Sequence, residues 1–143
     1  GGGIRVEVGA LTGTGEIQAK GNALSSTRGG GGGRVAVYYD EATSAFAWGN
    51  ISAAGHGGGA GTIFLKSNSA LYGDLVFDNK NRIGNASDVR PTEIPASPTG
   101  MQTFRDFIVV RKASVVTLDA LDVTRIITVD SSSRLQSQNI SLP

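Results

Sequence analysis

Three times between residues 1 and 78, the chain runs a cluster of glycines into a short segment in which apolar residues alternate with others. The alternating segments begin at Ile4, Val35 and Ile63, 31 and then 28 residues apart. A second, shorter segment, which we call the echo, follows each of them after 13, 16 and 12 residues, respectively. The echo is again a glycine with alternating apolar residues. A strand-based repeat of this period is typical of stacked coils, in which each coil contacts only its neighbours. The repeat therefore predicts an all-β fold of the parallel β-helix, or β-solenoid, type.

Period-two alternation also predicts which side chains point inward. In parallel coils, equivalent positions of neighbouring strands lie above one another and build continuous aliphatic ladders. The expected interior residues are Ile4, Val6, Ile17, Val35, Val37, Ile51, Ile63, Leu65, Leu75 and Phe77. An antiparallel sandwich is the alternative, since alternating strands with glycine turns occur there too. Strand order separates the two, because only the solenoid makes the strands at Val35 and Ile63 parallel neighbours.

The glycine clusters are expected at the corners of the coils. Equivalent residues of neighbouring coils lie only about 4.8 Å apart. Glycine tolerates positive φ and presents no side chain to the coil above or below. A flexible glycine linker is the other interpretation, but linkers are not followed at a regular distance by alternating strands. We therefore expect Gly-rich corners.

We interpret the chain as a single β-solenoid segment, residues 1–143. Within it, residues 1–78 hold the glycine-cornered coils, 79–100 form a long inserted loop, and 101–143 hold further coils with Asp and Ser turns. Because the sequence begins on a repeat corner without an initiator methionine, we interpret it as a fragment of a larger chain.

The insertion is marked by Pro91, Pro95 and Pro98. Proline cannot donate to a strand ladder, so we expect this segment to leave the sheet and cross the surface as a loop. Because prolines fix φ, the loop should fold against one face of the solenoid, with at least two of four apolar anchors buried. The anchors are Ile83, Val89, Ile94 and Met101.

Two segments carry a family resemblance. Residues 58–79, GGAGTIFLKSNSALYGDLVFDN, resemble a recurring unit of very large secreted bacterial adhesin-like surface proteins with right-handed parallel β-helices. The tail 107–135, FIVVRKASVVTLDALDVTRIITVDSSSRL, is similar to the stacked coils of the same class. The resemblance implies the fold and a secreted or cell-surface location. It carries no catalytic residues.

Composition excludes several classes of function. The net charge is +1 with scattered Lys and Arg, whereas nucleic-acid binding needs cations gathered on one face. No apolar run approaches the roughly 20 residues that span a bilayer. The absence of cysteine excludes disulfides, thiolate metal sites and cysteine nucleophiles. His56 is the only histidine and has no acidic residue within ten positions, so we expect a corner histidine at the surface and no catalytic triad.

Motifs for cofactors and metals are incomplete. No glycine run is followed by the Gly-Lys-Ser/Thr of a phosphate loop. Segment 78–84 suggests a calcium loop, but Lys80 and Arg82 stand where oxygen donors are needed. We therefore predict no cofactor and no metal ligand.

An aromatic cluster admits two interpretations. Tyr38, Tyr39, Phe46 and Trp48 could stack on sugar rings at an exposed face. The interpretation that we favour is that Tyr39, Phe46 and Trp48 cover the apolar interior.

Two carboxylate pairs are candidates for sugar cleavage, because glycoside hydrolysis requires two carboxyl groups. Period-two alternation lets Asp74 share a face with Asp78, and Asp119 with Asp122. A charged solvent face is the interpretation that we favour for both pairs.

The sequence thus predicts a non-enzymatic structural or adhesive segment of a large secreted or cell-surface protein, a rigid stalk or filament building block without catalytic residues. The expected partners are flanking coils or domains of the parent chain and, end to end, other copies of the segment. A surface glycan or protein receptor is a further candidate, whereas nucleic acid and membrane insertion are not expected. The alternative is a carbohydrate-binding or carbohydrate-cleaving β-helix that uses the aromatic cluster and the aspartates.

Overall fold

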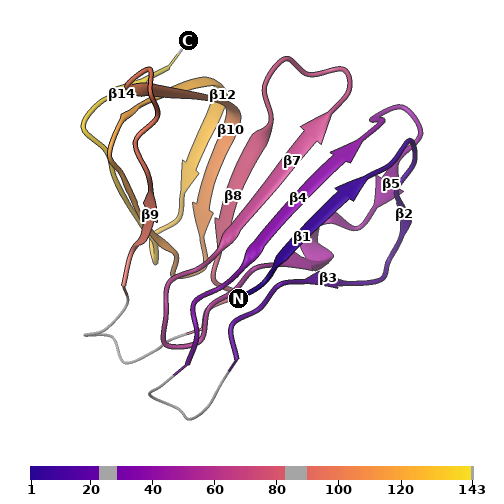
Figure 1. The fold of residues 1–143 in the computed structure, drawn as a ribbon, viewed down its shortest axis with the longest axis horizontal. Helices are drawn as coiled ribbons and strands as arrows, with labels where there is room; N and C mark the ends of the chain where they lie inside the picture. Colours follow the sequence, from indigo (N-terminus) through magenta and orange to yellow (C-terminus); the bar gives the residue numbers. More distant parts are fainter. Residues whose placement is uncertain (23–28, 83–89, 143) are drawn as a thin grey trace.

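The computed structural model describes residues 1–22, 29–82 and 90–142 (Figure 1). These residues form short strands and one 3-10 turn, η1 (Trp48–Asn50), with no α-helix among them. The strands are β1 (Gly3–Glu7), β2 (Thr12–Gly13), β3 (Ile17–Gln18), β4 (Arg34–Tyr39), β5 (Ala45–Phe46), β6 (Ile51–Ser52), β7 (Thr62–Ser67), β8 (Asp74–Asp78), β9 (Thr92–Ile94), β10 (Met101–Val110), β11 (Ser114–Thr117), β12 (Ala120–Val129), β13 (Arg134–Gln136) and β14 (Ile140–Ser141). The all-β prediction is confirmed.

One seven-stranded sheet, in the order β1-β4-β7-β8-β10-β12-β14, runs through the molecule (Figure 1). Strands β1, β4 and β7 are parallel to one another, and so are β8, β10, β12 and β14. The two groups meet at the antiparallel pair β7–β8. We call β1 to β7 the first stack and β8 to β14 the second stack.

In the first stack the predicted repeat is present. Ile4 pairs with Val35 and Val35 with Ile63, in parallel register. The echo strands also stack, because β3 pairs with β6 in parallel, with Ile17 opposite Ile51. The strands at Val35 and Ile63 are thus parallel neighbours, as the coil arrangement requires and the antiparallel sandwich does not.

All ten residues expected in the interior are buried or partly buried. Six of them are buried, namely Val35, Val37, Ile51, Ile63, Leu75 and Phe77. The four that are only partly buried are Ile4, Val6, Ile17 and Leu65. Ile4, Val6 and Ile17 belong to the first coil, whose outer side has no neighbouring strand among the described residues. Their partial exposure therefore marks an open end of the apolar interior.

The third copy of the repeat departs from the prediction. Strand β8 does not stack on β3 and β6 but folds back on β7, with Leu65 opposite Asp74. The turn between them closes tightly at Gly73, where a Cβ atom would lie 2.4 Å from the Phe64 ring. Glycine at this position lets the chain reverse beside that ring. The prediction of a mostly parallel third coil at Leu75 is therefore wrong.

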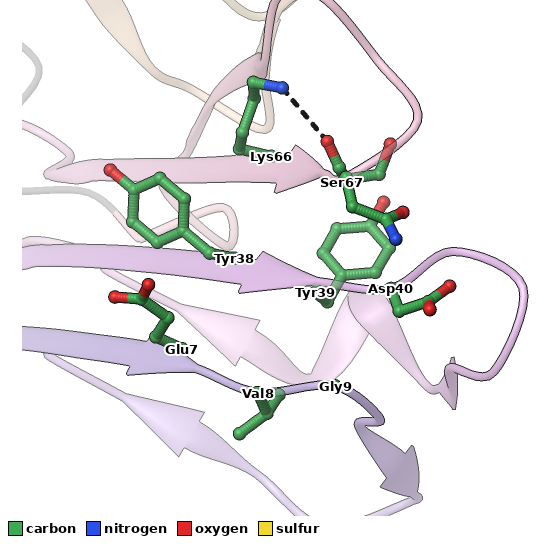
Figure 2. A pocket seen from close by; sticks show the side chains of 9 residues that line it. Glu7, Val8, Gly9, Tyr38, Tyr39, Asp40, Lys66 and Ser67 are labelled. Carbon is green, nitrogen blue, oxygen red and sulfur yellow. Dashed lines mark hydrogen bonds between the residues drawn. The ribbon is translucent and has the colours of Figure 1, made fainter.

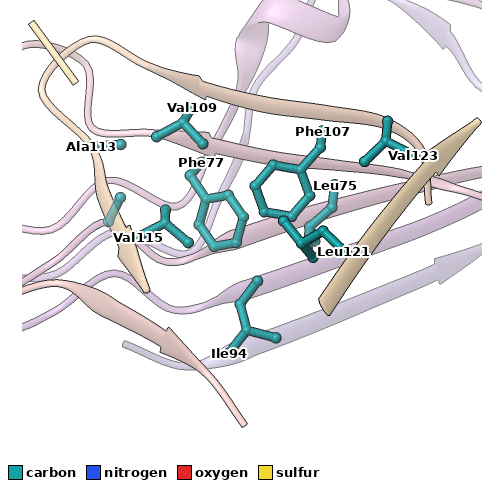
Figure 3. Close-up of a cluster of buried hydrophobic side chains, with 10 residues drawn as sticks. Leu75, Phe77, Ile94, Phe107, Val109, Ala113, Val115, Leu121 and Val123 are labelled. Carbon is teal, nitrogen blue, oxygen red and sulfur yellow. The ribbon is translucent and has the colours of Figure 1, made fainter. Parts of the chain in front are cut away.

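The hairpin places two apolar cores on opposite faces of the shared sheet. On β7, Ile63 packs in the core of the first stack, whereas the next residue, Phe64, packs against that of the second. On β8, Leu75 and Phe77 belong to the second core, and Val76 between them contacts the first. Figure 3 shows the second core, with Phe77 beside Phe107. Strands β7 and β8 are therefore apolar on both faces.

The two stacks are related by a half-turn about the stacking direction. Strand direction reverses at β7–β8 and the crossover strands move to the opposite face, while the strand order still advances with the sequence.

The insertion 79–100 is not entirely a loop. Residues Thr92–Ile94 form β9, which pairs in parallel with β11 at one edge of a three-stranded sheet, β13-β11-β9. Pro91 and Pro95 flank β9 directly, outside its pairing, which is why they do not prevent it. The prediction that this segment leaves the sheet is therefore wrong for β9.

The apolar anchors of the insertion divide. Ile94 is buried in the second core, whereas Met101 is half exposed. Ile83 and Val89 lie outside the described residues. At least two buried anchors were expected. Of the two that the structure describes, only Ile94 is buried.

The glycine clusters are explained by close approach of backbones. A Cβ atom on Gly61 would lie 1.8 Å from the Gly33 carbonyl oxygen, and one on Gly33 would lie 2.0 Å from that of Gly2. Neither Gly33 nor Gly61 has positive φ. Neighbouring coils therefore touch through their corners, where no side chain fits.

Candidate functional site

Asp–Arg pairs lie along the second stack, one strand apart. The Arg105 guanidinium donates to both carboxylate oxygens of Asp74, at 2.7 and 2.6 Å. Arg125 binds Asp106 in the same bidentate way, at 2.7 and 2.5 Å. Both arginines sit where a bulge interrupts the β10–β12 register, between Phe104 and Asp106. A bulge re-aims side chains, and here it turns two successive arginines onto carboxylates of the preceding strand.

A third pair closes the corner after β8. Arg111 donates through Nε to Asp78 at 2.7 Å and also through Nη2, and the Lys80 ammonium lies 3.3 Å from the same carboxylate. Asp74 and Asp78 therefore do share one side of β8, as alternation predicts. They are buried and ion-paired, however, so the expectation of a charged solvent face is wrong for this pair.

These contacts determine what the carboxylates can do. Hydrogen bonds that Asp106 accepts from Arg125 lower the pKa of Asp106, and the hydrogen bonds that Arg105 donates to Asp74 raise the pKa of Arg105. Two hydrogen bonds from one guanidinium favour the ionised form of a carboxylate and engage both of its oxygens. Each of these pairs therefore ties two neighbouring strands of the second stack together.

The two aspartates of the other predicted carboxylate pair lie in different surroundings. Asp119 is buried and accepts hydrogen bonds from the Ser97 amide and, at 3.4 Å, from Gln102. It therefore ties the end of the insertion to the second stack. Asp122 is only partly buried and lies opposite Ser141 in the β12–β14 register.

The aromatic cluster separates onto two faces of the sheet. Tyr39 is buried with its ring 4.5 Å from that of Trp48, and Phe46 lies 5.8 Å from Trp48. All three pack in the first core, so the predicted interior position is confirmed. Burial raises the pKa of the Tyr39 phenol. Tyr38 points to the other face, where the Arg5 guanidinium lies 4.5 Å from its ring centre.

Tyr38 borders an open basin at the ends of β1, β4 and β7 (Figure 2). The basin has a volume of about 610 Å³, and Glu7, Tyr38 and Lys66 stand along its side. Lys66 is already engaged, because its ammonium donates to the backbone carbonyls of Ser67 and Ala70. The basin is wide and open rather than enclosed, and most of its lining surface is apolar.

A smaller pocket, which the sequence did not suggest, lies beside β3 and β6. We call it the β6 pocket. Its volume is about 340 Å³, and its lining is polar and rich in cations. The lining residues are Glu16, Gln18, Lys20, Gly49, Asn50, Ser52, Lys80 and Arg82. The only sequence feature that could have indicated this pocket is the pair of cations Lys80 and Arg82, which on sequence grounds argued only against a calcium loop.

The described part of the chain contains no cluster of side chains suited to hold a metal ion. There, no group of three or more His, Asp or Glu side chains could hold a metal ion. His56 is partly buried in a glycine-rich corner, and its amide donates to the Gly30 carbonyl at 2.9 Å.

Both ends of the seven-stranded sheet have open edges among the described residues. β1 pairs only with β4, and β14 covers only Leu121 and Asp122 of the long strand β12. The rest of β12 therefore presents an uncovered edge, with Ile126 half exposed. Such edges can accept a further strand.

The chain has no match among protein-family models, curated proteins or solved structures. No described helix has the length and apolar character needed to cross a membrane.

Proposed function

We propose that this chain is a β-solenoid segment with a non-enzymatic structural or adhesive role in a large secreted or cell-surface protein. The observation that carries the proposal is the continuous seven-stranded sheet, which keeps parallel register within each stack and ends in open edges. A stack of this kind gains stability from contacts between neighbouring coils and can be extended by adding more. It therefore suits a stalk or filament building block.

The partners in this proposal are further coils or domains of a parent chain, or a second copy joined edge to edge. The open end of the first stack supports it, because Ile4, Val6 and Ile17 are partly exposed beside the free β1 edge. An added strand would cover these side chains and pair with the backbone at once. The extracellular location rests on the resemblance to adhesin-like proteins.

The paired aspartates favour the structural role over sugar cleavage. Of the two carboxylate pairs that could serve hydrolysis, Asp74 and Asp78 are held by arginines. In the other pair Asp119 is buried beside Ser97, and Trp48 packs against the first core. We therefore expect no reducing sugar to be released from polysaccharides by this chain. Turnover that is lost in Asp74→Asn would favour the alternative, a carbohydrate-cleaving domain.

The experiment that tests the proposal blocks the β1 edge. The Arg34 amide donates to the Gly2 carbonyl and the Val8 amide to the Tyr38 carbonyl, so the even-numbered residues of β1 face β4. The backbone of Arg5 consequently faces outward. Arg5→Pro removes an outward N–H and leaves the β1–β4 bonds in place, because proline has no amide hydrogen. Arg5→Ala is the matched control, which loses the same side chain but keeps the edge.

Sedimentation over a wide concentration range should show that the unmodified chain and Arg5→Ala associate into oligomers that grow with concentration. Arg5→Pro should stop at a dimer, since only the β12 edge remains. A chain that stays monomeric throughout, or an Arg5→Pro variant that associates as far as Arg5→Ala, would contradict edge-to-edge assembly.

A further inference from the structure

The β6 pocket lies where the third copy of the repeat fails. Strands β3 and β6 form a two-stranded ladder, and no third echo strand continues it because β8 turns back on β7. The turn after β8, residues 79–82, lies against this ladder instead. The side-chain oxygen of Asn79 accepts a hydrogen bond from the Gly55 amide at 2.9 Å. The Lys80 ammonium donates a hydrogen bond to the Gly49 carbonyl at 2.7 Å. The turn thus forms one wall of the pocket.

Hydrogen bonds hold this turn in one conformation. The Asn79 side chain is buried and also donates to the Arg82 carbonyl at 2.9 Å, while the Lys80 amide donates to Asp78 at 2.9 Å. Lys80 and Asn81 both have left-handed backbones, with φ of 53° and 58°. Non-glycine residues adopt this region only when their surroundings impose it. The pocket wall is therefore preorganised, which reduces the entropy lost when a ligand binds.

Positive charge predominates in the pocket. Lys20, Lys80 and Arg82 line it together with a single acid, Glu16. Lys80 shares Asp78 with Arg111, whereas Lys20 and Arg82 form no ion pair with another described residue. Two cations from distant parts of the sequence therefore line the same small space without an ion pair to another described residue, and Glu16 is the one acid beside them.

Neutral hydrogen-bonding groups complete the lining. Gln18 and Ser52 are register neighbours on β3 and β6, and Asn50 lies at the end of η1, directly before β6. The Asn50 amide nitrogen is used on the Thr14 carbonyl, which leaves its oxygen as an acceptor. The volume of about 340 Å³ lies at the lower end of the range of small-molecule sites, about 300–1,000 Å³. This is more space than a bare ion fills.

We propose that the β6 pocket binds an anionic sugar, with a carboxylate or sulfate held by Lys20 and Arg82 and hydroxyl groups held by Gln18, Asn50 and Ser52. Cations beside amides and hydroxyls match a ligand that has one charged group and several neutral donors and acceptors. The site is independent of the open strand edges, so it can exist whether or not the chain assembles edge to edge.

The test is calorimetric titration of the full chain with three probes. These are an oligogalacturonate, which is carboxylated, a heparin-derived oligosaccharide, which is sulfated, and a neutral maltooligosaccharide. Saturable binding of at least one charged probe, weakened by added salt, is expected, with no binding of the neutral one. The two charged probes distinguish carboxylate from sulfate.

Charge-removing variants locate the site. Lys20→Gln and Arg82→Gln should each weaken binding about tenfold, the loss expected for one charge-assisted hydrogen bond. The matched control is Lys112→Gln, which removes a cation from the equivalent left-handed corner after β10, outside the pocket. It should change the affinity less than about twofold. Circular dichroism confirms that each variant is folded, and Lys20→Gln does not involve the strained turn.

The proposal is overturned if neither charged probe binds, or if Lys112→Gln weakens binding as much as the pocket variants. Equal binding of the neutral probe would exclude the role assigned to the cations. None of these results depends on the sedimentation of Arg5→Pro.

Discussion

Replacement of Gly73 by alanine tests the hairpin that reverses the chain between the two stacks. A Cβ atom at this position would lie 2.4 and 2.5 Å from two atoms of the Phe64 ring and 2.9 Å from the Leu65 carbonyl oxygen. The ring cannot move freely, because it packs against the second core and its centre lies 6.0 Å from that of Tyr38. The added methyl group must therefore displace packed atoms.

The magnitude follows from two opposing effects. Overpacking of this kind costs about 1–3 kcal/mol. Gly73 does not have positive φ, so alanine also gains about 0.4–1 kcal/mol by restricting the unfolded chain. We expect a net loss of about 1–2 kcal/mol in the free energy of unfolding, measured by urea denaturation. Gly49→Ala is the matched control, since nothing lies within 4 Å of its Cβ position, and it should be neutral or slightly stabilising.

A second measurement identifies the cause. If the Phe64 ring is responsible, the cost of Gly73→Ala should fall to less than about half in a Phe64→Leu background, because neighbouring changes couple. Gly73→Ala that is as stable as Gly49→Ala, or a cost that is unchanged without the ring, would refute the close approach on which the hairpin depends.

Two further predictions concern stability. Hydrogen bonds from Arg125 lower the pKa of Asp106, so the stability that this carboxylate contributes is present above its unfolded pKa, about 3.9, and is lost as pH falls through the folded value. Asp106→Asn should therefore cost about 1–2 kcal/mol at pH 7, a modest value because Arg125 is half exposed, and should flatten the decline below pH 4. Asp122 has no ion pair among the described residues, so Asp122→Asn should have neither effect. If Asp106→Asn and the unmodified chain gave identical acid denaturation curves, the stabilising role of the Asp106–Arg125 pair would be contradicted. Trp48→Ala should lower stability by about 2–3 kcal/mol, somewhat less than for a fully buried tryptophan, whereas Tyr72→Ala in the exposed turn should have an effect within about 0.5 kcal/mol. An unchanged melting temperature in Trp48→Ala would show that Trp48 is not part of the core.

The sequence predicted the first stack well because its signal is local. Alternation fixes which side chains point inward, and the glycine clusters mark the corners, so the register of Ile4, Val35 and Ile63 could be anticipated. The same alternation could not reveal that β8 runs backward. Leu75 and Phe77 alternate identically in either direction, and only the Phe64–Gly73 contact, which is tertiary, distinguishes them.

Polar contacts were harder to predict than apolar ones. Asp74 and Arg105, like Asp106 and Arg125, are far apart in the sequence and meet only because a bulge turns the arginines. The β6 pocket depends in turn on the missing third echo, so it could not be expected from a repeat that was assumed to continue. Strand β9 was hidden because prolines flank it on both sides.

The half-turn between the stacks has a consequence for what the molecule can display. In an uninterrupted coil, every decoration at a given corner would emerge on the same flank. Here the crossover segments of the first stack emerge on one side of the shared sheet, and those of the second stack, with β9, emerge on the other (Figure 1). One antiparallel strand pair thus lets a single ribbon present loops in two opposite directions, and another such pair would return the following coils to the original flank.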